Sequence, residues 1–283
     1  MLAARMRDRI FEPGDVLYER GQPSGPMFFV TRGQVALEAP GEAPWVFEDR
    51  AFLGAIDANT QEPHPRTARA LTRTHAIEMH FEEYLMLLED FFDFARATLV
   101  QGAKRTHETA LELAPGGLFR APGAPAGRWL ERAELDELQR LLVLKSSFAF
   151  ERSPVQPLVT LARLGEERRL KAAKRLFGAG EPNRGLFLVA EGRVRVHHDD
   201  PHVDGLVGPG DMVLGLLGIV NEPYAYSADA ASDLVLLAIT HEDLYDAMEE
   251  HFGLARSWWV YMGKENHRLR EAIGRRDADR AAG

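Results

Sequence analysis

The sequence contains no cysteine, which excludes disulfide bonds, zinc sites with thiolate ligands and cysteine nucleophiles. It also has no run of about 18 apolar residues, so it predicts no membrane-spanning helix. The first residues, Met1–Arg7, lack the apolar core of a secretory signal peptide. Together these absences predict a cytoplasmic protein without a membrane partner.

An excess of basic residues is missing as well. The chain has 34 Lys and Arg against 43 Asp and Glu, a formal net charge of −9 at pH 7. Because a DNA-binding surface must be basic enough to attract phosphates, this balance argues against a DNA partner. No Gly-x-Ser-x-Gly elbow, Walker loop or His-Glu-x-x-His motif is present, so the sequence predicts neither an enzyme nor a bound cofactor.

One polar stretch, His197–Asp204, is rich in potential metal ligands. It also lies between two predicted strands, where a polar hairpin tip is expected. The hairpin tip needs no further assumption and is the favoured interpretation, so no metal site is predicted.

What the sequence does contain is an internal repeat. A set of residues in the first half recurs in the second half at a constant spacing of 159 positions, as Leu17 and Leu176 do. A chain of 283 residues is long enough for two domains of ordinary size, and the repeat predicts two copies of one domain. The other pairs are Gly21 with Gly180, Pro23 with Pro182, Phe28 with Phe187, Val30 with Val189, Gly33 with Gly192, and Val35 with Val194.

Within each copy, short apolar runs alternate with glycine and proline turns, a pattern typical of antiparallel strands. The second copy shows this pattern from Arg168 to about Ile239. We therefore predict an α+β, mainly β fold of two antiparallel jelly-roll-like β-barrels, each with flanking helices. The runs of the first copy are Met27–Val30, Val35–Leu37, Trp45–Phe47, Thr67–Ala70 and Ala76–Met79.

The strands are flanked by helical patterns. Apolar residues at spacings of three and four predict one helix from Phe81 to about Leu113. An apolar stripe predicts helix over Trp129–Leu142, and a closing helix is expected over Thr240–Ile273, with Thr240 as its N-cap. Residues 1–10 predict one or two helical turns before the first strand.

Between the copies lies a stretch with three prolines and four glycines, Ala114–Gly127. This composition has little capacity for regular structure and predicts a linker. The linker separates a first domain, residues 1–113, from a second domain, residues 128–283.

These glycines and strands, preceded by helix and followed by a long helix, resemble the cyclic nucleotide-binding domain family. The first copy carries the resemblance in Gly14-Asp15 and in the repeated residues from Leu17 to Val35. The second carries it in the matching residues together with Glu191-Gly192, Pro209-Gly210-Asp211 and Gly215. The segment Thr67–Thr72 also resembles the strand that follows the family's binding cassette. The resemblance covers nearly the whole chain as two tandem copies.

The resemblance also implies where a ligand would bind. In the family, a phenylalanine-glycine-glutamate segment starts a short helix that faces the cyclic phosphate, and its glutamate accepts from the ribose hydroxyl. An arginine about ten residues later binds the phosphate oxygens. In the second copy, Gly215 is followed by Leu216 instead of glutamate, and Tyr224 stands at the arginine position, with Ser227 three residues on. The second cassette is therefore predicted to be degenerate.

The first cassette keeps more of the expected pattern. Gly54 keeps the glycine, but Ala55 replaces the glutamate, so no ribose acceptor is provided. Two alignments of the following segment stay open: His64 replaces the arginine, or Arg66 keeps it with Thr67 next in the cassette. The internal repeat favours His64, because the preceding Glu-Pro pair then matches the Glu-Pro pair of the second copy.

The leading hypothesis is a non-enzymatic regulatory or scaffolding protein that acts through contacts with a protein partner or with a second copy of itself. The alternative is a small-nucleotide sensor that binds a cyclic nucleotide or another phosphate ligand in the first domain, through His64 or Arg66.

Limited trypsin digestion tests the predicted linker. Its composition leaves few backbone hydrogen bonds, so we expect the first cuts at Arg120 or Arg128, ahead of any site within the strands. Mass spectrometry of the early fragments locates the cut. Initial cleavage inside a strand region would contradict the predicted division.

Overall fold

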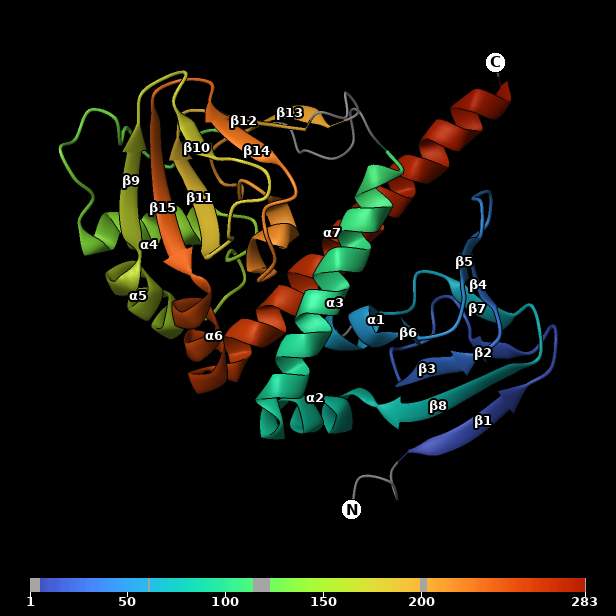
Figure 1. Ribbon diagram of the computed structural model, residues 1–283. Helices are drawn as coiled ribbons and strands as arrows, with labels where there is room; N and C mark the ends of the chain where they lie inside the picture. The colour runs from blue at the N-terminus through green and yellow to red at the C-terminus, as the bar shows by residue number, and fades with distance from the viewer. Residues whose placement is uncertain (1–5, 61, 114–122, 199–202, 283) are drawn as a thin grey trace. The chain divides into compact units, whose positions relative to one another are not determined.

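The computed structural model describes residues 6–60, 62–113, 123–198 and 203–282 (Figure 1). Its contacts divide the chain into two units, one of residues 1–92 with 274–283 and the other of residues 93–273. Across the described ranges, no helix combines the length and the apolar character needed to cross a membrane.

The first unit contains two four-stranded antiparallel sheets. Their strand orders are β1-β8-β3-β6 and β2-β7-β4-β5. The short helix α1 follows β6, and α2 follows β8 (Figure 1). The bounds are β1 Arg7–Phe11, β2 Val16–Tyr18, β3 Pro26–Arg32, β4 Val35–Glu38, β5 Trp45–Phe47, β6 Ala51–Leu53, α1 Ala55–Thr60, β7 Thr67–Ala70, β8 Thr74–His80 and α2 Phe81–Asp90.

Buried side chains from both sheets form the hydrophobic cluster of this unit. Phe28 and Val30 of β3 belong to it, as do Ala68 and Ala70 of β7. Their spacing of two follows from strand geometry, because successive side chains point to opposite faces of a sheet. The loop between β6 and β7, which carries the predicted first cassette, is therefore attached at both ends to strands that contribute to this core.

The second unit repeats the arrangement with one strand fewer. It has a four-stranded sheet, β10-β14-β12-β13, and a three-stranded sheet, β11-β15-β9, both antiparallel. The strand bounds are β9 Glu166–Leu170, β10 Arg175–Phe177, β11 Gly185–Glu191, β12 Val194–His197, β13 Asp204–Val207, β14 Ser227–Ala230 and β15 Leu234–Thr240. The helices are α3 Phe92–Leu111, α4 Glu137–Ser146, α5 Val155–Leu164, the 3₁₀ helix η2 Gly215–Ile219, α6 His241–Glu250 and α7 Phe252–Ala282, of which Phe92 and the part of α7 from residue 274 onward belong to the first unit.

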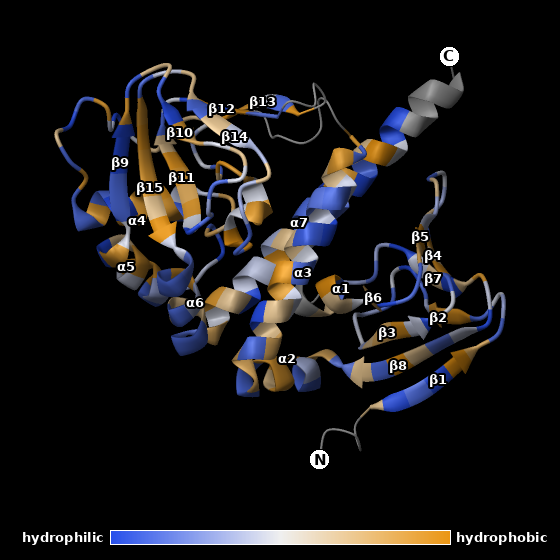
Figure 2. Cartoon of the chain, in the orientation of Figure 1, coloured by the Kyte–Doolittle hydropathy of each residue, from blue (hydrophilic) through white to orange (hydrophobic). Residues whose placement is uncertain are grey.

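Buried apolar side chains of several strands form the core of this unit, among them Val189 of β11, Val194 of β12, Ala228 of β14 and Leu234 of β15. Residues 234–237 of β15 are all buried, and Figure 2 shows this strand as hydrophobic while its neighbour β9 is hydrophilic. A strand buried on both faces has a continuous apolar sequence, as this one does. The predicted α+β class, with antiparallel strands and flanking helices in two domains, is confirmed.

Two long helices predicted from the sequence are broken. The expected helix over residues 81–113 ends as α2 at Asp90 and restarts as α3, because Phe91 leaves the helical region with φ −129° and ψ 74°. The closing helix breaks in the same way at His251, with φ −130° and ψ 79°. The breaks at Phe91 and His251 lie 160 positions apart, within one residue of the repeat spacing, so the internal duplication includes the helix break. The predicted N-cap is confirmed, since the Thr240 side chain accepts from the Asp243 N–H.

Two other helix predictions were also wrong in extent. No helix precedes the first strand within the described residues from residue 6 onward, because β1 already begins at Arg7. The helix expected over residues 129–142 begins only at Glu137. Asp136 fixes this start through a capping box with Gln139, in which each side chain accepts from the other residue's N–H.

Parts of two predicted segments lie outside the described residues. The linker Ala114–Gly127 is described only from residue 123, and the polar stretch His197–Asp204 lacks residues 199–202. The flanks of the polar stretch are β12 and β13, which pair with each other. Among the described residues, no group of acidic and histidine side chains is arranged to hold a metal ion.

A pair of glycine substitutions tests how the turns are held. Gly192 has φ +93°, and a Cβ there would lie 2.2 Å from the Asp233 carbonyl oxygen. Gly180 has φ +83° but no atom within 4 Å of the same position, which makes it a matched control. We expect Gly180→Ala to cost about 1 kcal/mol, from backbone conformation alone, and Gly192→Ala to cost about 3 kcal/mol. Thermal and urea unfolding measure both, and equal losses would contradict the predicted clash.

Candidate functional site

The first cassette begins where β6 passes into α1. Gly54 takes φ +79°, and a Cβ there would lie 3.4 Å from the His64 ring and 3.6 Å from the Tyr18 ring. The left-handed backbone favours glycine at this position, whereas a Cβ would contact the two rings only at ordinary van der Waals distances. Ala55 is the first residue of α1.

His64 is buried at the end of this cassette, with its side chain 2% exposed. Its ring stacks on that of Tyr18, with centroids 3.9 Å apart and an interplanar angle of 18°. Its Nδ1 lies 2.7 Å from Asp57 Oδ2, and because a carboxylate can only accept, the ring nitrogen donates. Burial and, second to it, the charge of Asp57 raise the pKa of Tyr18, so the phenol remains neutral.

Arg66, the other candidate cation, is also buried. Its guanidinium lies over the Trp45 ring, 3.8 Å from the centroid, and pairs with the Glu42 carboxylate. It also donates to the Leu37 and Ala43 carbonyls at 3.3 Å each. All these partners belong to β4, β5 and the turn between them, so Arg66 is oriented toward that hairpin.

The second cassette has the same backbone frame with different side chains. Leu216, in η2, is buried, and Tyr224 stacks on Phe177 with centroids 3.8 Å apart and an interplanar angle of 15°. The Tyr224 backbone carbonyl accepts from the Gly180 N–H at 2.8 Å, and the Tyr224 N–H donates to the Glu181 carbonyl at 2.9 Å.

The first cassette makes the same two backbone bonds. The His64 carbonyl accepts from Gly21 N–H at 2.8 Å, and its N–H donates to the Gln22 carbonyl at 3.0 Å. His64 and Tyr224 are therefore structural counterparts, which supports the alignment that puts His64 at the arginine position. The residues that follow also have matching roles, since Thr67 accepts from the Arg20 N–H at 3.1 Å and Ser227 from the Ala179 N–H at 3.0 Å.

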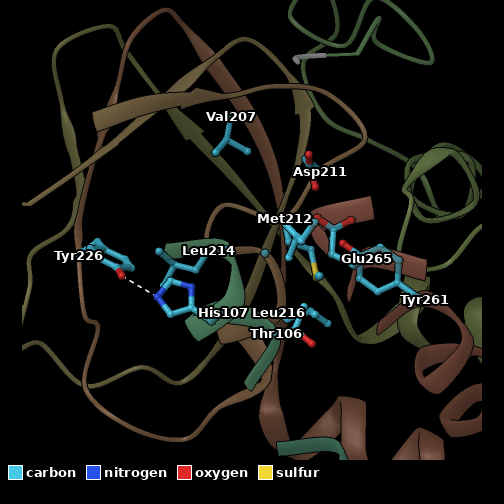
Figure 3. Close-up of a pocket in the computed structure, with 13 residues that line it drawn as sticks. Thr106, His107, Val207, Asp211, Met212, Leu214, Leu216, Tyr226, Tyr261 and Glu265 are labelled. Atoms are coloured by element: carbon cyan, nitrogen blue, oxygen red, sulfur yellow. Dashed lines mark hydrogen bonds between the residues drawn. The ribbon is translucent and has the colours of Figure 1, made fainter. Parts of the chain in front are cut away.

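A small cavity lies at the second cassette, between the barrel and residues of α3 and α7 (Figure 3). Its volume is about 70 Å³, enough for a few water molecules. Gly215, Leu214 and Leu216 line it from the cassette side, and two acids, Asp211 and Glu265, are among the other lining residues. Among the described residues that line it, none is lysine or arginine.

Helix α3 is tied to this cassette by two side-chain contacts. His107 Nε2 and the Tyr226 hydroxyl lie 2.6 Å apart and face each other in Figure 3. Lys104 Nζ pairs with the Glu222 carboxylate at 2.5 Å. Burial lowers the pKa of His107 to about 4, so the ring is neutral near pH 7.

The comparison with protein families agrees with this geometry. The model of the cyclic nucleotide-binding domain matches residues 8–91 and 167–251, which are the two sets of strands described above. The chain belongs to the cyclic nucleotide-binding domain family. Domains of this family are usually non-catalytic and regulatory. No curated protein matches the sequence significantly.

Solved structures of the same family are similar at low identity. A regulatory subunit of a cAMP-independent protein kinase A from Trypanosoma brucei is 16% identical, with 93% of this chain and 86% of that chain covered and a TM-score of 0.37. The regulatory domain of Toxoplasma gondii protein kinase A, crystallised with cAMP, is 13% identical, with coverage of 93% and 87% and a TM-score of 0.36.

A shorter match is the N-terminal domain of a transcriptional regulator from Streptomyces coelicolor A3(2). It is 24% identical, covers 46% of this chain and 94% of that chain, and has a TM-score of 0.40. Likenesses at this level carry no information about ligand or partner.

Sequence reasoning missed several residues of the two cassettes. Asp57 lies two positions after Ala55, the residue at the family's glutamate position. This closeness to the cassette could have marked it as a candidate. Tyr18 and Phe177 occupy repeat-related positions, and their shared aromatic character was a second signal. The contact between His107 and Tyr226 joins residues 119 positions apart, and no sequence pattern indicates it.

The buried imidazole of His107 predicts a pH dependence. In the unfolded chain this histidine binds a proton near its ordinary pKa of about 6.5, whereas in the folded chain it stays neutral down to about 4. Stability is therefore lost as the pH falls through this window, by up to about 1.4 kcal/mol per pH unit. His107→Gln keeps an acceptor for Tyr226 but removes the titration, so its stability should fall less between pH 7 and pH 5.

Urea unfolding followed by tryptophan fluorescence measures this difference. Tyr226→Phe is the matched control, because it removes the hydrogen bond and keeps the buried imidazole, so it should retain the wild-type pH dependence. Identical pH dependence of wild type and His107→Gln would contradict the assignment.

Proposed function

We propose that this protein is a non-enzymatic regulatory or scaffolding protein whose two cassettes are degenerate and which acts through protein contacts. The observation that carries the proposal is the lining of the second-cassette cavity. Two carboxylate residues, Asp211 and Glu265, line it, and the described lining residues include no lysine or arginine. Glu265 is itself paired with Arg268, so a cyclic phosphate placed there meets two carboxylate residues in the lining and no lysine or arginine among the described lining residues.

The physical cost of such binding supports this proposal. A phosphate leaving water must exchange its hydration for charge-assisted hydrogen bonds, and a buried ion without a counter-charge is strongly disfavoured. Tyr224, at the arginine position, offers a neutral phenol stacked on Phe177. Leu216, at the glutamate position, offers no acceptor for a ribose hydroxyl.

The first cassette supports the same conclusion by a different route. Both of its candidate cations already contact carboxylates of this chain, Arg66 with Glu42 and His64 with Asp57. A phosphate ligand must displace one of these internal partners before it can bind. The alternative function, a nucleotide sensor in the first domain, requires that displacement.

Regulation through protein contacts has a structural route in α3. This helix begins at Phe92, one residue after the break that ends α2, and its residues Thr106, His107 and Ala110 line the second-cassette cavity. A partner that binds α3 and moves it therefore acts directly on the helix whose residues line the second-cassette cavity. Such a helix shift at a hinge is a common regulatory transition.

Calorimetric titration of the full chain with cyclic AMP and cyclic GMP tests the proposal. We expect no saturable binding of either nucleotide, meaning a Kd weaker than about 1 mM. A family member that binds cyclic AMP serves as the positive control. Micromolar binding would contradict the proposal, and Arg66→Ala would then show whether the first cassette is responsible.

A further inference from the structure

Asp57 and His64 occupy the two sides of the first cassette and contact each other directly. Asp57 lies on α1, three residues after the cassette glycine, and His64 stands at the arginine position ahead of β7. The distance from His64 Nδ1 to Asp57 Oδ2 is 2.7 Å, a full hydrogen bond. A phosphate therefore has no space between the two groups in this arrangement.

The pair is also shielded from solvent. The His64 side chain is 2% exposed and the Asp57 side chain 18%. The Tyr18 ring covers one face of the imidazole. Because water cannot readily replace either partner, the carboxylate meets the hydrogen-bonding need of the buried imidazole from within the chain.

The second cassette provides an internal comparison. The residue three positions after its glycine is Gly218, and the residue at its arginine position is Tyr224. A neutral phenol needs no counter-charge, and no carboxylate is found at position 218. The cassette with an imidazole therefore has an acid three residues after its glycine, and the cassette with a phenol has a glycine at that position.

We propose that Asp57 is an internal substitute for the phosphate of a ligand and that its carboxylate excludes anions from the first cassette. This inference deepens the proposed function, since it assigns the loss of ligand response in the first domain to one residue. It follows that removing the carboxylate should leave the His64 ring facing an opening that accepts a small anion.

The experiment compares the full-length wild type with Asp57→Ala in a buffer free of phosphate. Inorganic phosphate is the probe, and the readout is the shift of the melting temperature with phosphate concentration at one fixed pH. We expect a saturable stabilisation of Asp57→Ala and an apparent affinity at least about tenfold above that of the wild type.

Two control variants test whether phosphate binds beside His64. Glu62→Ala removes an equal charge from an exposed position of the same loop and should behave like the wild type. The double variant Asp57→Ala with His64→Gln should lose the phosphate response, because the anion then has no ionisable partner. A response that survives in the double variant would place the anion elsewhere and overturn the proposal.

Asp57→Ala without a phosphate response would also overturn the proposal, provided that it unfolds cooperatively. If Asp57→Ala does not fold, Asp57→Asn keeps the shape of the side chain, removes its charge and is titrated in the same way. If the wild type binds cyclic AMP and Asp57→Ala binds it equally well, the proposed function is contradicted. The phosphate titration then still decides the role of Asp57.

Discussion

Each cassette has a ring stack, His64 on Tyr18 in the first domain and Tyr224 on Phe177 in the second. Each stack joins the last residue of a short strand, β2 or β10, to the loop just before the strand that pairs with it, β7 or β14. Each stack is supported by the same pair of backbone hydrogen bonds on both sides of the stacked residue. Because the stacked residue is buried in both domains, any ionisable group at this position must find its partner inside the protein. In the first domain His64 pairs with Asp57, and in the second domain the position holds Tyr224, a neutral phenol.

The constraint links the two proposals. In the second domain the position holds a neutral phenol, and the nearby cavity has acids but no described lysine or arginine. In the first domain the position holds an imidazole, and Asp57 pairs with it. Under the two proposals, neither cassette needs a phosphate ligand, the second because its position carries no charge and the first because Asp57 supplies a carboxylate. In the proposed function, helices such as α3, whose His107 contacts Tyr226 in the second domain, carry the regulation.

Much of the fold could be predicted, because the patterns that specify it are local. The pattern of short apolar runs predicted β3, β4, β5, β7 and β8, and the glycines that recur after 159 residues predicted the two copies. The helix breaks at Phe91 and His251 were not predicted, since apolar spacing continues across both positions while the backbone leaves the helical region. Apolar periodicity reports which face is buried and does not report a change of direction.

The candidate site was only partly accessible from the sequence. Alignment of the repeats predicted that His64 and Tyr224 share a position, and the shared backbone bonds support it. The sequence by itself thus determined the duplication, the strand pattern and the residue types that replace the family's charged groups. Only the tertiary structure decided which partners those residues have, Asp57 for His64, Glu42 for Arg66 and Tyr226 for His107. Hydrogen bonds and ion pairs depend on distance and direction in space, and residues far apart in the chain acquire both only when the strands and helices pack.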